Sequence, residues 1–587
     1  MPPESQPVRG QQPVEGESVQ SMMDEALTHH RSGRLAEAEQ IYRRILAAHP
    51  WHADCLHLLG MIAYEAGDLE TAANLIRQAI SIHASGVSYY VNLGTVLQAQ
   101  GNIDEAEAQY RYALLLRPNL PEVHVNLGNV LQAKGKLDES IVCYQTALVS
   151  SPDNADSHNN LGNSLRQQGK FEAAMACYRR ALDLKPDYPE AYYNIGNACY
   201  AQNLLDEAAS NYLVALAMKP DYAECLYNLG RVLREQGRLE EALTAYAKAL
   251  AIRPDYPQAA FENASAQLLV GNFTVGWPGF ERRWDSSDHD TPRRDYPLPT
   301  WNGELFEFGN LLIWAEQGVG DEIMFAGLVP DAMRTGNRCI LHCDPRLEPL
   351  FARSFPTALI VANTGAALPA DLNIASQLPC GSLPGLFRQT ISSFAATTSP
   401  YLVADPASVQ RLRARYFEGR LLVGLAWHTS NVKTGKFRSI DLALLTPLFS
   451  QGNVQWVSLQ YGDPDALAIQ TAAANLPILI DPTVNQLTDM DTFAAQISAM
   501  DLVITIDNST AHLAGALGVP VWVLLPFAPD WRWLLERDDS PWYPTMKLFR
   551  QPKPGDWPSV VEKMKTNRVA DGSYAGSKGI YPPEVSR

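Results

Sequence analysis

Small and bulky apolar residues alternate with a fixed period over the first half of the chain. Within one unit, Gly128 and Ala147 alternate with the bulky Leu131 and Tyr144, as two antiparallel helices need for close approach. Gly135 supplies the turn between the helices. The period of 34 residues is marked by the glycines Gly60, Gly94, Gly128, Gly162, Gly196 and Gly230, the alanines Ala79, Ala113, Ala147, Ala181, Ala215 and Ala249, and the prolines Pro50, Pro118, Pro152, Pro186, Pro220 and Pro254. The pattern predicts an array of helical pairs.

This period and residue pattern resemble the tetratricopeptide repeat. We count seven units over residues 17–254 and a divergent eighth unit that ends near Asp288, in which Ala264 replaces the helix glycine. The resemblance implies an α-solenoid over residues 17–288, preceded by a disordered tail at residues 1–16. The eighth unit is expected to cap the stack and join it to the second half.

One asparagine recurs on the first helix of five successive units. The ladder comprises Asn92, Asn126, Asn160, Asn194 and Asn228. A side-chain amide both donates and accepts, so a row of amides can hold a peptide backbone of any sequence. The ladder resembles the one with which the repeat domain of O-GlcNAc transferase holds an acceptor polypeptide. The alternative is that each asparagine bonds only to a neighbouring repeat.

Short apolar strands separated by helical stretches follow after residue 288. The expected strands are Leu311–Ala315, Cys339–His342, Leu359–Val361, Leu421–Trp427, Val454–Leu459, Asp501–Asp507 and Val519–Leu525. This alternation is typical of parallel sheets built from βαβ units. We expect a proline-rich linker at 289–304, two Rossmann-like subdomains at 305–410 and 411–570, and a tail at 571–587.

The sharpest motif, residues 507–518, joins the end of one apolar strand to a helix. Asp507 ends the strand, and Asn508, Ser509 and Thr510 can cap the helix, whose free N–H groups suit a diphosphate. The motif resembles the donor site of glycosyltransferase family 9, the heptosyltransferases, and loosely that of O-GlcNAc transferase. The resemblance implies the GT-B architecture, contact of Asp507 with the donor sugar, and contact of Ser509, Thr510 and His512 with the phosphates. The alternative is an N-cap with a core histidine.

A glycine-rich turn, residues 318–322, follows the first strand of the second half. Gly318 and Gly320 permit close approach of the backbone to a ligand. The turn resembles the Gly-x-Gly-Asp motif of the heptosyltransferases, and this resemblance implies that Asp321 is the general base of an inverting transferase. The alternative is that Asp321 only caps its helix; Glu316 and His428 are then reserve bases.

A polar loop, residues 427–441, opens the other subdomain. Its cations Lys433, Lys436 and Arg438 can neutralise a leaving diphosphate without a metal, or are solvated surface charges. The family resemblance favours Arg438, although heptosyltransferases commonly carry lysine in the comparable place. Gln460 is assigned, from its position at a strand end, to the nucleotide base or ribose.

Composition and simple motifs bear on nucleic-acid binding, on the cellular location and on metal binding. The net charge of −17 without a clustered basic surface argues against nucleic-acid binding. The chain has no secretory signal and no membrane span, which indicates the cytoplasm. We predict no metal and no cofactor. The acidic pairs without an assigned ligand role are Asp288/Asp290, Asp463/Asp465 and Asp489/Asp491.

The sequence therefore predicts a metal-independent, inverting glycosyltransferase of cytoplasmic location. It would transfer a sugar from a nucleotide-sugar donor to an acceptor presented by the repeats, either a protein or a glycan. The rival hypothesis is a non-catalytic adaptor that keeps the shape of the transferase without turnover. Because repeat arrays often dimerise, the oligomeric state is open between a monomer and a homodimer.

Overall fold

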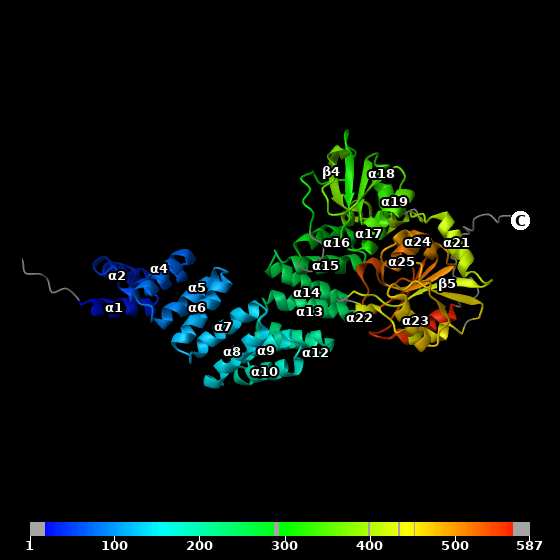
Figure 1. Ribbon diagram of the computed structural model, residues 1–587. Helices are drawn as coiled ribbons and strands as arrows, with labels where there is room; N and C mark the ends of the chain where they lie inside the picture. Colours follow the sequence, from blue (N-terminus) through cyan, green and yellow to red (C-terminus); the bar gives the residue numbers. More distant parts are fainter. Residues whose placement is uncertain (1–17, 287–292, 397–398, 432–434, 451, 568–587) are drawn as a thin grey trace, which may run out of the picture. The chain divides into compact units, whose positions relative to one another are not determined.

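The computed structural model describes residues 18–286, 293–396, 399–431, 435–450 and 452–567 (Figure 1). Lys433, the pair Asp288/Asp290 and the expected tails at 1–16 and 571–587 lie outside the described residues. The chain divides into two compact units at the bond between Pro220 and Asp221. In the described part of the chain, no helix is both long and apolar enough to cross a membrane.

The first unit consists of helical pairs. Its helices are α1 (Val19–Arg31), α2 (Leu35–Ala48), α3 (Ala53–Glu65), α4 (Leu69–Ile82), α5 (Val87–Ala99), α6 (Ile103–Leu116), α7 (Pro121–Ala133), α8 (Leu137–Ser150), α9 (Ala155–Gln167), α10 (Phe171–Leu184), α11 (Pro189–Ala201) and α12 (Leu205–Met218). The second unit begins with four more, α13 (Ala223–Glu235), α14 (Leu239–Ile252), α15 (Pro257–Leu269) and α16 (Phe273–Phe280), and the 3-10 helix η1 (Glu281–Asp285). The predicted helical repeats are confirmed.

The periodic residues do what the pattern predicts. Gly135 has φ of 71°, the left-handed backbone that ends α7 and turns the chain into α8. The ring of Tyr144 is fully buried and fills the space above Gly128, where a Cβ would lie 2.7 Å from Cε1 of the ring. The same glycine and tyrosine meet in the next unit, at Gly162 and Tyr178. Close helix contact therefore depends on the absence of a side chain at these glycines.

Replacing Gly128 by alanine is expected to lower the free energy of unfolding of the repeat array by about 1–3 kcal/mol, because Tyr144 must move to admit a methyl group. Urea unfolding followed by circular dichroism measures the change. Gly452→Ala is the matched control, since a Cβ there meets no atom within 4 Å and φ is not left-handed. Equal stability of the two variants would contradict this account.

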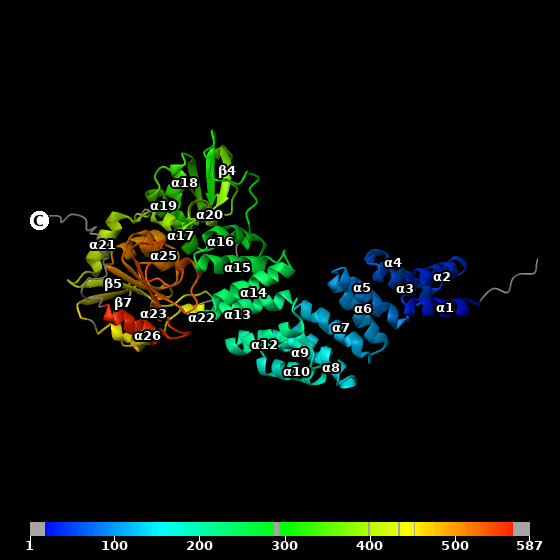
Figure 2. The same ribbon diagram turned by 180° about the vertical axis from the view of Figure 1, so that it is seen from behind.

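Two parallel sheets complete the second unit (Figures 1 and 2). The first sheet, in the order β3-β2-β1-β4, contains β1 (Asn310–Trp314), β2 (Arg338–Cys343), β3 (Leu359–Ala362) and β4 (Ile374–Pro379). The second sheet, in the order β10-β9-β8-β5-β6-β7, contains β5 (Leu421–Ala426), β6 (Val454–Ser458), β7 (Ile478–Leu479), β8 (Leu502–Ile506), β9 (Val521–Leu525) and β10 (Met546–Arg550). We call residues 293–396 the first lobe and residues 399–567 the second lobe.

Helices surround both sheets. The first lobe carries α17 (Val319–Ala326), α18 (Val329–Arg334), α19 (Glu348–Ser354), α20 (Leu383–Phe387) and the 3-10 helices η2 (Pro345–Leu347), η3 (Ala370–Leu372), η4 (Cys380–Ser382) and η5 (Ile391–Ala396). The second lobe carries α21 (Pro406–Tyr416), α22 (Gly435–Arg438), α23 (Pro464–Ala473), α24 (Met490–Ser498), α25 (Ser509–Ala516), α26 (Trp557–Thr566), η6 (Leu442–Leu448) and η7 (Trp531–Trp533).

The seven expected strands coincide with observed strands, but three observed strands were not expected. β4 contains the polar Ser376 and Gln377, and β10 mixes apolar and basic residues, so neither has a continuous apolar run. β7 is apolar but has only two residues. The helical stretch after β1 is divided into α17 and α18. Pro330, at the start of α18, supplies no N–H to an uninterrupted helix.

Candidate active site

The order of the strands defines one location on each sheet where a ligand can bind. In the second sheet the chain runs outward from β5 to β6 and β7, then continues on the other side of β5 with β8 and β9. In the first sheet it runs outward from β1 to β2 and β3 and returns beside β1 with β4. Ligands of open parallel sheets bind outside the carboxyl ends of the strands at such switch points. The predicted residues Asp321 and Asp507 follow β1 and β8, beside these two points.

The start of α25 contains buried polar atoms without hydrogen bonds. Asn508 caps the helix: its Oδ1 accepts from the N–H of Ala511 at 3.3 Å and from Oγ1 of Thr505 at 3.0 Å. Within the described residues, Nδ2 of Asn508 and Oγ1 of Thr510 have no hydrogen-bond partner, although both atoms are buried. Such groups are rare in folded proteins and are commonly satisfied by a ligand or by water.

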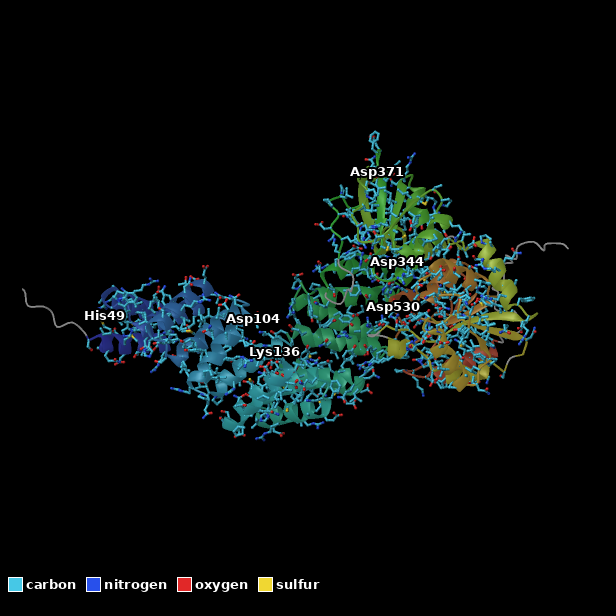
Figure 3. All side chains as sticks on the ribbon, viewed as in Figure 1. His49, Asp104, Lys136, Asp344, Asp371 and Asp530 are labelled. Carbon is cyan, nitrogen blue, oxygen red and sulfur yellow. The ribbon has the colours of Figure 1, made fainter. Side chains whose placement is uncertain are left out.

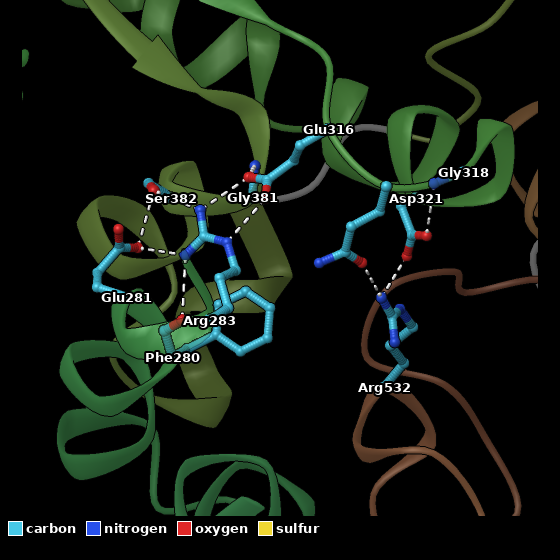
Figure 4. Close-up of polar contacts among 10 residues, drawn as sticks. Phe280, Glu281, Arg283, Glu316, Gly318, Asp321, Gly381, Ser382 and Arg532 are labelled. Atoms are coloured by element: carbon cyan, nitrogen blue, oxygen red, sulfur yellow. Dashed lines mark hydrogen bonds and ion pairs between the residues drawn. The ribbon is translucent and has the colours of Figure 1, made fainter. Parts of the chain in front are cut away.

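Alternating charges connect this helix start to the first lobe. Arg438 lies 3.2 Å from the carboxylate of Asp507 and 3.7 Å from that of Asp530. Arg532 pairs with Asp530, which is labelled in Figure 3, at 2.6 Å and also pairs with Asp321 (Figure 4). The cluster therefore brings together the loop after β5, the end of β8, the loop after β9 and the start of α17.

Burial and charge act differently on the two acids of the second lobe. Burial, together with the neighbouring carboxylate of Asp530, raises the pKa of Asp507, and the guanidinium groups of Arg438 and Arg532 offset this effect only in part. Burial also raises the pKa of Asp530, but Arg532 and Arg438 together outweigh burial and hold its pKa at about 2. Asp530 is therefore ionised near neutral pH and keeps the two arginines in place.

Asp321 has two partners. Its Oδ2 accepts from the N–H of Gly318 at 3.3 Å, as expected of a residue that caps α17, and its Oδ1 pairs with Arg532 (Figure 4). Gln317, which has a left-handed backbone with φ of 63°, accepts from the same guanidinium at 3.2 Å. The carboxylate therefore caps its helix and also projects toward the second lobe, and 22% of its side chain is exposed.

The two lobes meet directly at the predicted donor site. A Cβ on Gly320 would lie 3.4 Å from the Cα of Ser509 and from the Cδ2 of His512, so this glycine lets α17 lie against α25. His512 stacks on Trp533 with ring centroids 5.4 Å apart, and its Nδ1 lies 3.0 Å from the hydroxyl of Tyr543. Burial lowers the pKa of His512 to about 3, so the imidazole is neutral near pH 7. In this structure α17 covers part of the helix start.

Two other predicted residues, Gln460 and Glu316, have structural partners. The side-chain amide of Gln460 is used by the backbone: Oε1 accepts from the N–H groups of Trp427 and His428, and Nε2 donates to two carbonyls. Gln460 thus fixes the loop after β5, and its part in nucleotide binding stays a prediction. The proposed reserve base Glu316 is buried in a bidentate pair with Arg283, which leaves it unsuited to proton transfer. His428 is exposed.

The acidic pairs act at helix starts. Asp463 and Asp489 are the N-cap residues of α23 and α24, and Asp491 pairs with Arg353 at 2.7 Å. Among the side chains that the structure describes, no group of three or more His, Cys, Asp or Glu residues could hold a metal ion.

Sequence reasoning missed the most connected residues of the cluster, Asp530 and Arg532. They lie in the tryptophan-rich segment from Pro529 to Trp533, where Asp530 caps η7 and Arg532 belongs to it. The available signal was their place shortly after β9, the neighbour of β8, since loops that leave adjacent parallel strands meet at one edge.

The asparagines of the first unit make bonds between repeats. Nδ2 of Asn160 donates to Asn129 at 3.1 Å, and Nδ2 of Asn194 donates to Asn159 at 2.9 Å. Asn92 lies 2.7 Å from Nε2 of His57. Asn126 is half-buried, and Asn228 belongs to the second unit. The amides thus contribute to contact between repeats, and peptide binding stays a prediction.

Comparison with known proteins identifies the repeats. Family profiles described as TPR repeat and tetratricopeptide repeat match residues 29–93, 94–135, 128–165, 162–203 and 193–257. Protein FlbA of Caulobacter vibrioides is 29% identical over 324 residues, which are 52% of this chain and 54% of that protein. The chain therefore spans about half the length of this curated relative.

Two solved structures match part of this chain. YrrB, a TPR protein with an unusual peptide-binding site, is 27% identical, with a TM-score of 0.26 over 32% of this chain and 96% of that chain. PilF of Pseudomonas aeruginosa is 20% identical, with a TM-score of 0.31 over 35% of this chain and 94% of that chain. The profile matches, together with the observed helical pairs, show that residues 29–257 are tetratricopeptide repeats.

Proposed function

We propose that this protein is a glycosyltransferase whose two lobes form a GT-B catalytic region and whose repeats present the acceptor. The observation that carries the proposal is the start of α25, where the unbonded polar atoms of Asn508 and Thr510 lie beside the Arg438 and Arg532 cluster, opposite a carboxylate of the other lobe. Free N–H groups and two guanidinium groups suit the diphosphate of a nucleotide sugar.

Each charged residue has a role in this proposal. Arg438 and Arg532 stabilise the negative charge of the leaving nucleotide diphosphate, as a metal does in other transferases. Asp321 removes the proton of the acceptor hydroxyl. A bound diphosphate competes with Asp321 for Arg532, so donor binding frees the carboxylate for the acceptor. Transfer then inverts the anomeric carbon, with the acceptor a protein or a glycan.

A second candidate function is a non-catalytic adaptor whose repeats bind a partner protein. The observation that favours it is the direct contact of Gly320 with Ser509 and His512, which covers part of the predicted donor site. A screen of ADP-, UDP- and GDP-sugars by thermal shift separates the two functions. If the protein is an enzyme, its donor should stabilise it by about 2.7 kcal/mol at a ligand concentration of 100 Kd. If it is an adaptor, none of the compounds should stabilise it.

Replacing Thr510 by valine is expected to weaken the best ligand of this screen by about 3–10-fold, because one hydrogen bond to the diphosphate is lost. The variant without ligand should be at least as stable as the wild type, since its buried hydroxyl has no partner among the described residues. Isothermal titration calorimetry measures the affinity. Thr446→Val, on the exposed side of η6, is the control. Unchanged affinity of the Thr510 variant would exclude this helix start as the donor site.

A further inference from the structure

The helices α16 and η1 contact residues that lie close in the chain to each partner of the ion pair between Asp321 and Arg532. Arg283 of η1 binds Glu316, in the loop that precedes α17 and Asp321 (Figure 4). Trp277 and Phe280 of α16 pack against Trp531, the neighbour of Arg532. These elements all belong to the second compact unit. We propose that the end of the array positions the reaction centre: Arg283 acts through Glu316 on Asp321, and Trp277 acts through Trp531 on Arg532.

The first contact joins Arg283 to Glu316, and both side chains are buried and hydrogen-bonded. Arg283 and the carboxylate of Glu316 are inaccessible to solvent and form a bidentate pair at 2.7 and 2.8 Å. The other donors of Arg283 bind the carbonyl of Phe280 at 3.2 Å, Glu281 at 2.9 Å and Ser382 at 2.9 Å, so all five N–H groups are used. This pairing selects a single position for Glu316, because a displaced carboxylate would leave a buried charge unpaired.

The position of Glu316 determines the start of α17. Its Oε1 also accepts from the N–H of Gly381 at 2.8 Å, where a side chain would overlap the carboxylate. Only Gln317, with its left-handed backbone, and Gly318 separate Glu316 from the first residue of α17. Asp321 is the third residue of this helix. Because this connection is short, a shift of Glu316 is transmitted to the Asp321 carboxylate.

The second contact is aromatic. The ring of Trp277 lies edge-on to Trp531, with centroids 5.4 Å apart, and Phe280 lies 5.5 Å from the same ring. The guanidinium of Arg532 in turn lies over Trp531, 4.5 Å from its centroid. Nε1 of Trp277 donates to the carbonyl of Arg388 at 2.7 Å, which fixes this indole on the first lobe. One helix of the repeats therefore holds residues from both lobes.

The inference rests on the proposed function and gives the repeats a role in catalysis as well as in acceptor binding. Arg283 is a positioning residue, since it touches no reacting group. If it acts through Asp321, its replacement should lower kcat and leave donor affinity unchanged. If Arg283 had a purely structural role, its replacement would lower both kcat and donor affinity, or would lower only the stability of the protein.

The test uses the full-length chain with Arg283→Lys, which keeps the buried charge but removes the planar fork. We expect kcat to fall by about 10–100-fold, as a displacement of about 1 Å of a reacting group can cost 10²-fold, with the donor Kd unchanged within about twofold. Arg282→Lys is the matched control, because Arg282 precedes Arg283 in the chain and pairs with the exposed carboxylates of Asp255 at 2.8 Å and Asp285 at 3.0 Å. Glu316→Gln provides a second variant if Arg283→Lys folds poorly.

Two further measurements separate positioning from general damage. In the Asp321→Asn background, Arg283→Lys should change the residual rate by less than about twofold, because the effects of substitutions at coupled residues are not additive. Hydrogen exchange of residues 315–323 should be faster in Arg283→Lys than in Arg282→Lys. The inference is wrong, and the proposed function is unaffected, if Arg283→Lys keeps the wild-type kcat. The same holds if Arg283→Lys lowers the rate by the same factor in the wild-type and Asp321→Asn backgrounds. A wild-type chain without turnover on any sugar nucleotide would overturn the proposed function and the inference together.

Discussion

Asp321→Asn is expected to lower kcat by about 10²–10⁴-fold while the donor Kd changes little. Asparagine has one acceptor oxygen where aspartate has two, so it keeps either the bond from the N–H of Gly318 or the bond from Arg532, but not both. It also cannot take up the proton of the acceptor hydroxyl, and this loss accounts for the fall in kcat. Initial rates at saturating donor, together with calorimetric titration of the donor, measure the two quantities.

Asp489→Asn is the matched control for this prediction. Asp489 is also an aspartate at a helix start, where its side chain accepts from the N–H of Thr492 at 3.0 Å, but it lies outside the charge cluster. The control should keep the rate of the wild type. If Asp321→Asn also kept that rate, Asp321 would be only a helix cap and another group would have to remove the acceptor proton.

Local features of the fold could be predicted because neighbouring residues determine them. The turn at Gly135 and the contact between Gly128 and Tyr144 recur with the period of the sequence, so one unit explains the others. The apolar runs of β5 and β8 identify strands buried on both faces. Strand β4, which carries Ser376 and Gln377, gives no such signal because its partners come from distant segments.

The candidate site could be predicted only in part. Asp507, Asn508 and Thr510 lie at one helix start, so a short motif is enough to group them. The pairing of Asp321 with Arg532 joins residues 211 positions apart and depends on how the lobes face each other. The partner of Glu316 is also distant in the sequence. Glu316 is a reserve base in the sequence analysis because nothing in its own segment shows that Arg283 of η1 neutralises it.

Replacing the buried Glu322 by glutamine is expected to remove a strong pH dependence from the stability of the second unit. Burial raises the pKa of Glu322 from 4.5 to about 8, and the N–H of Asp344, which donates to the carboxylate at 2.9 Å, offsets only part of this effect. The folded protein therefore holds a proton that the unfolded chain releases above pH 4.5. Stability from this group is complete below pH 4.5 and declines as the pH rises toward 8.

The loss amounts to about 5 kcal/mol at most, since one pKa unit corresponds to about 1.4 kcal/mol. Glutamine does not ionise and can still accept from Asp344, so Glu322→Gln should match the wild type near pH 4.5 and be several kcal/mol more stable at pH 8.5. Urea unfolding across this range measures the difference, with the exposed Glu348→Gln as the control. A difference between Glu322→Gln and the wild type that stayed constant with pH would show that Glu322 is ionised in the folded protein, because only a proton held by the native state makes stability decline over this interval.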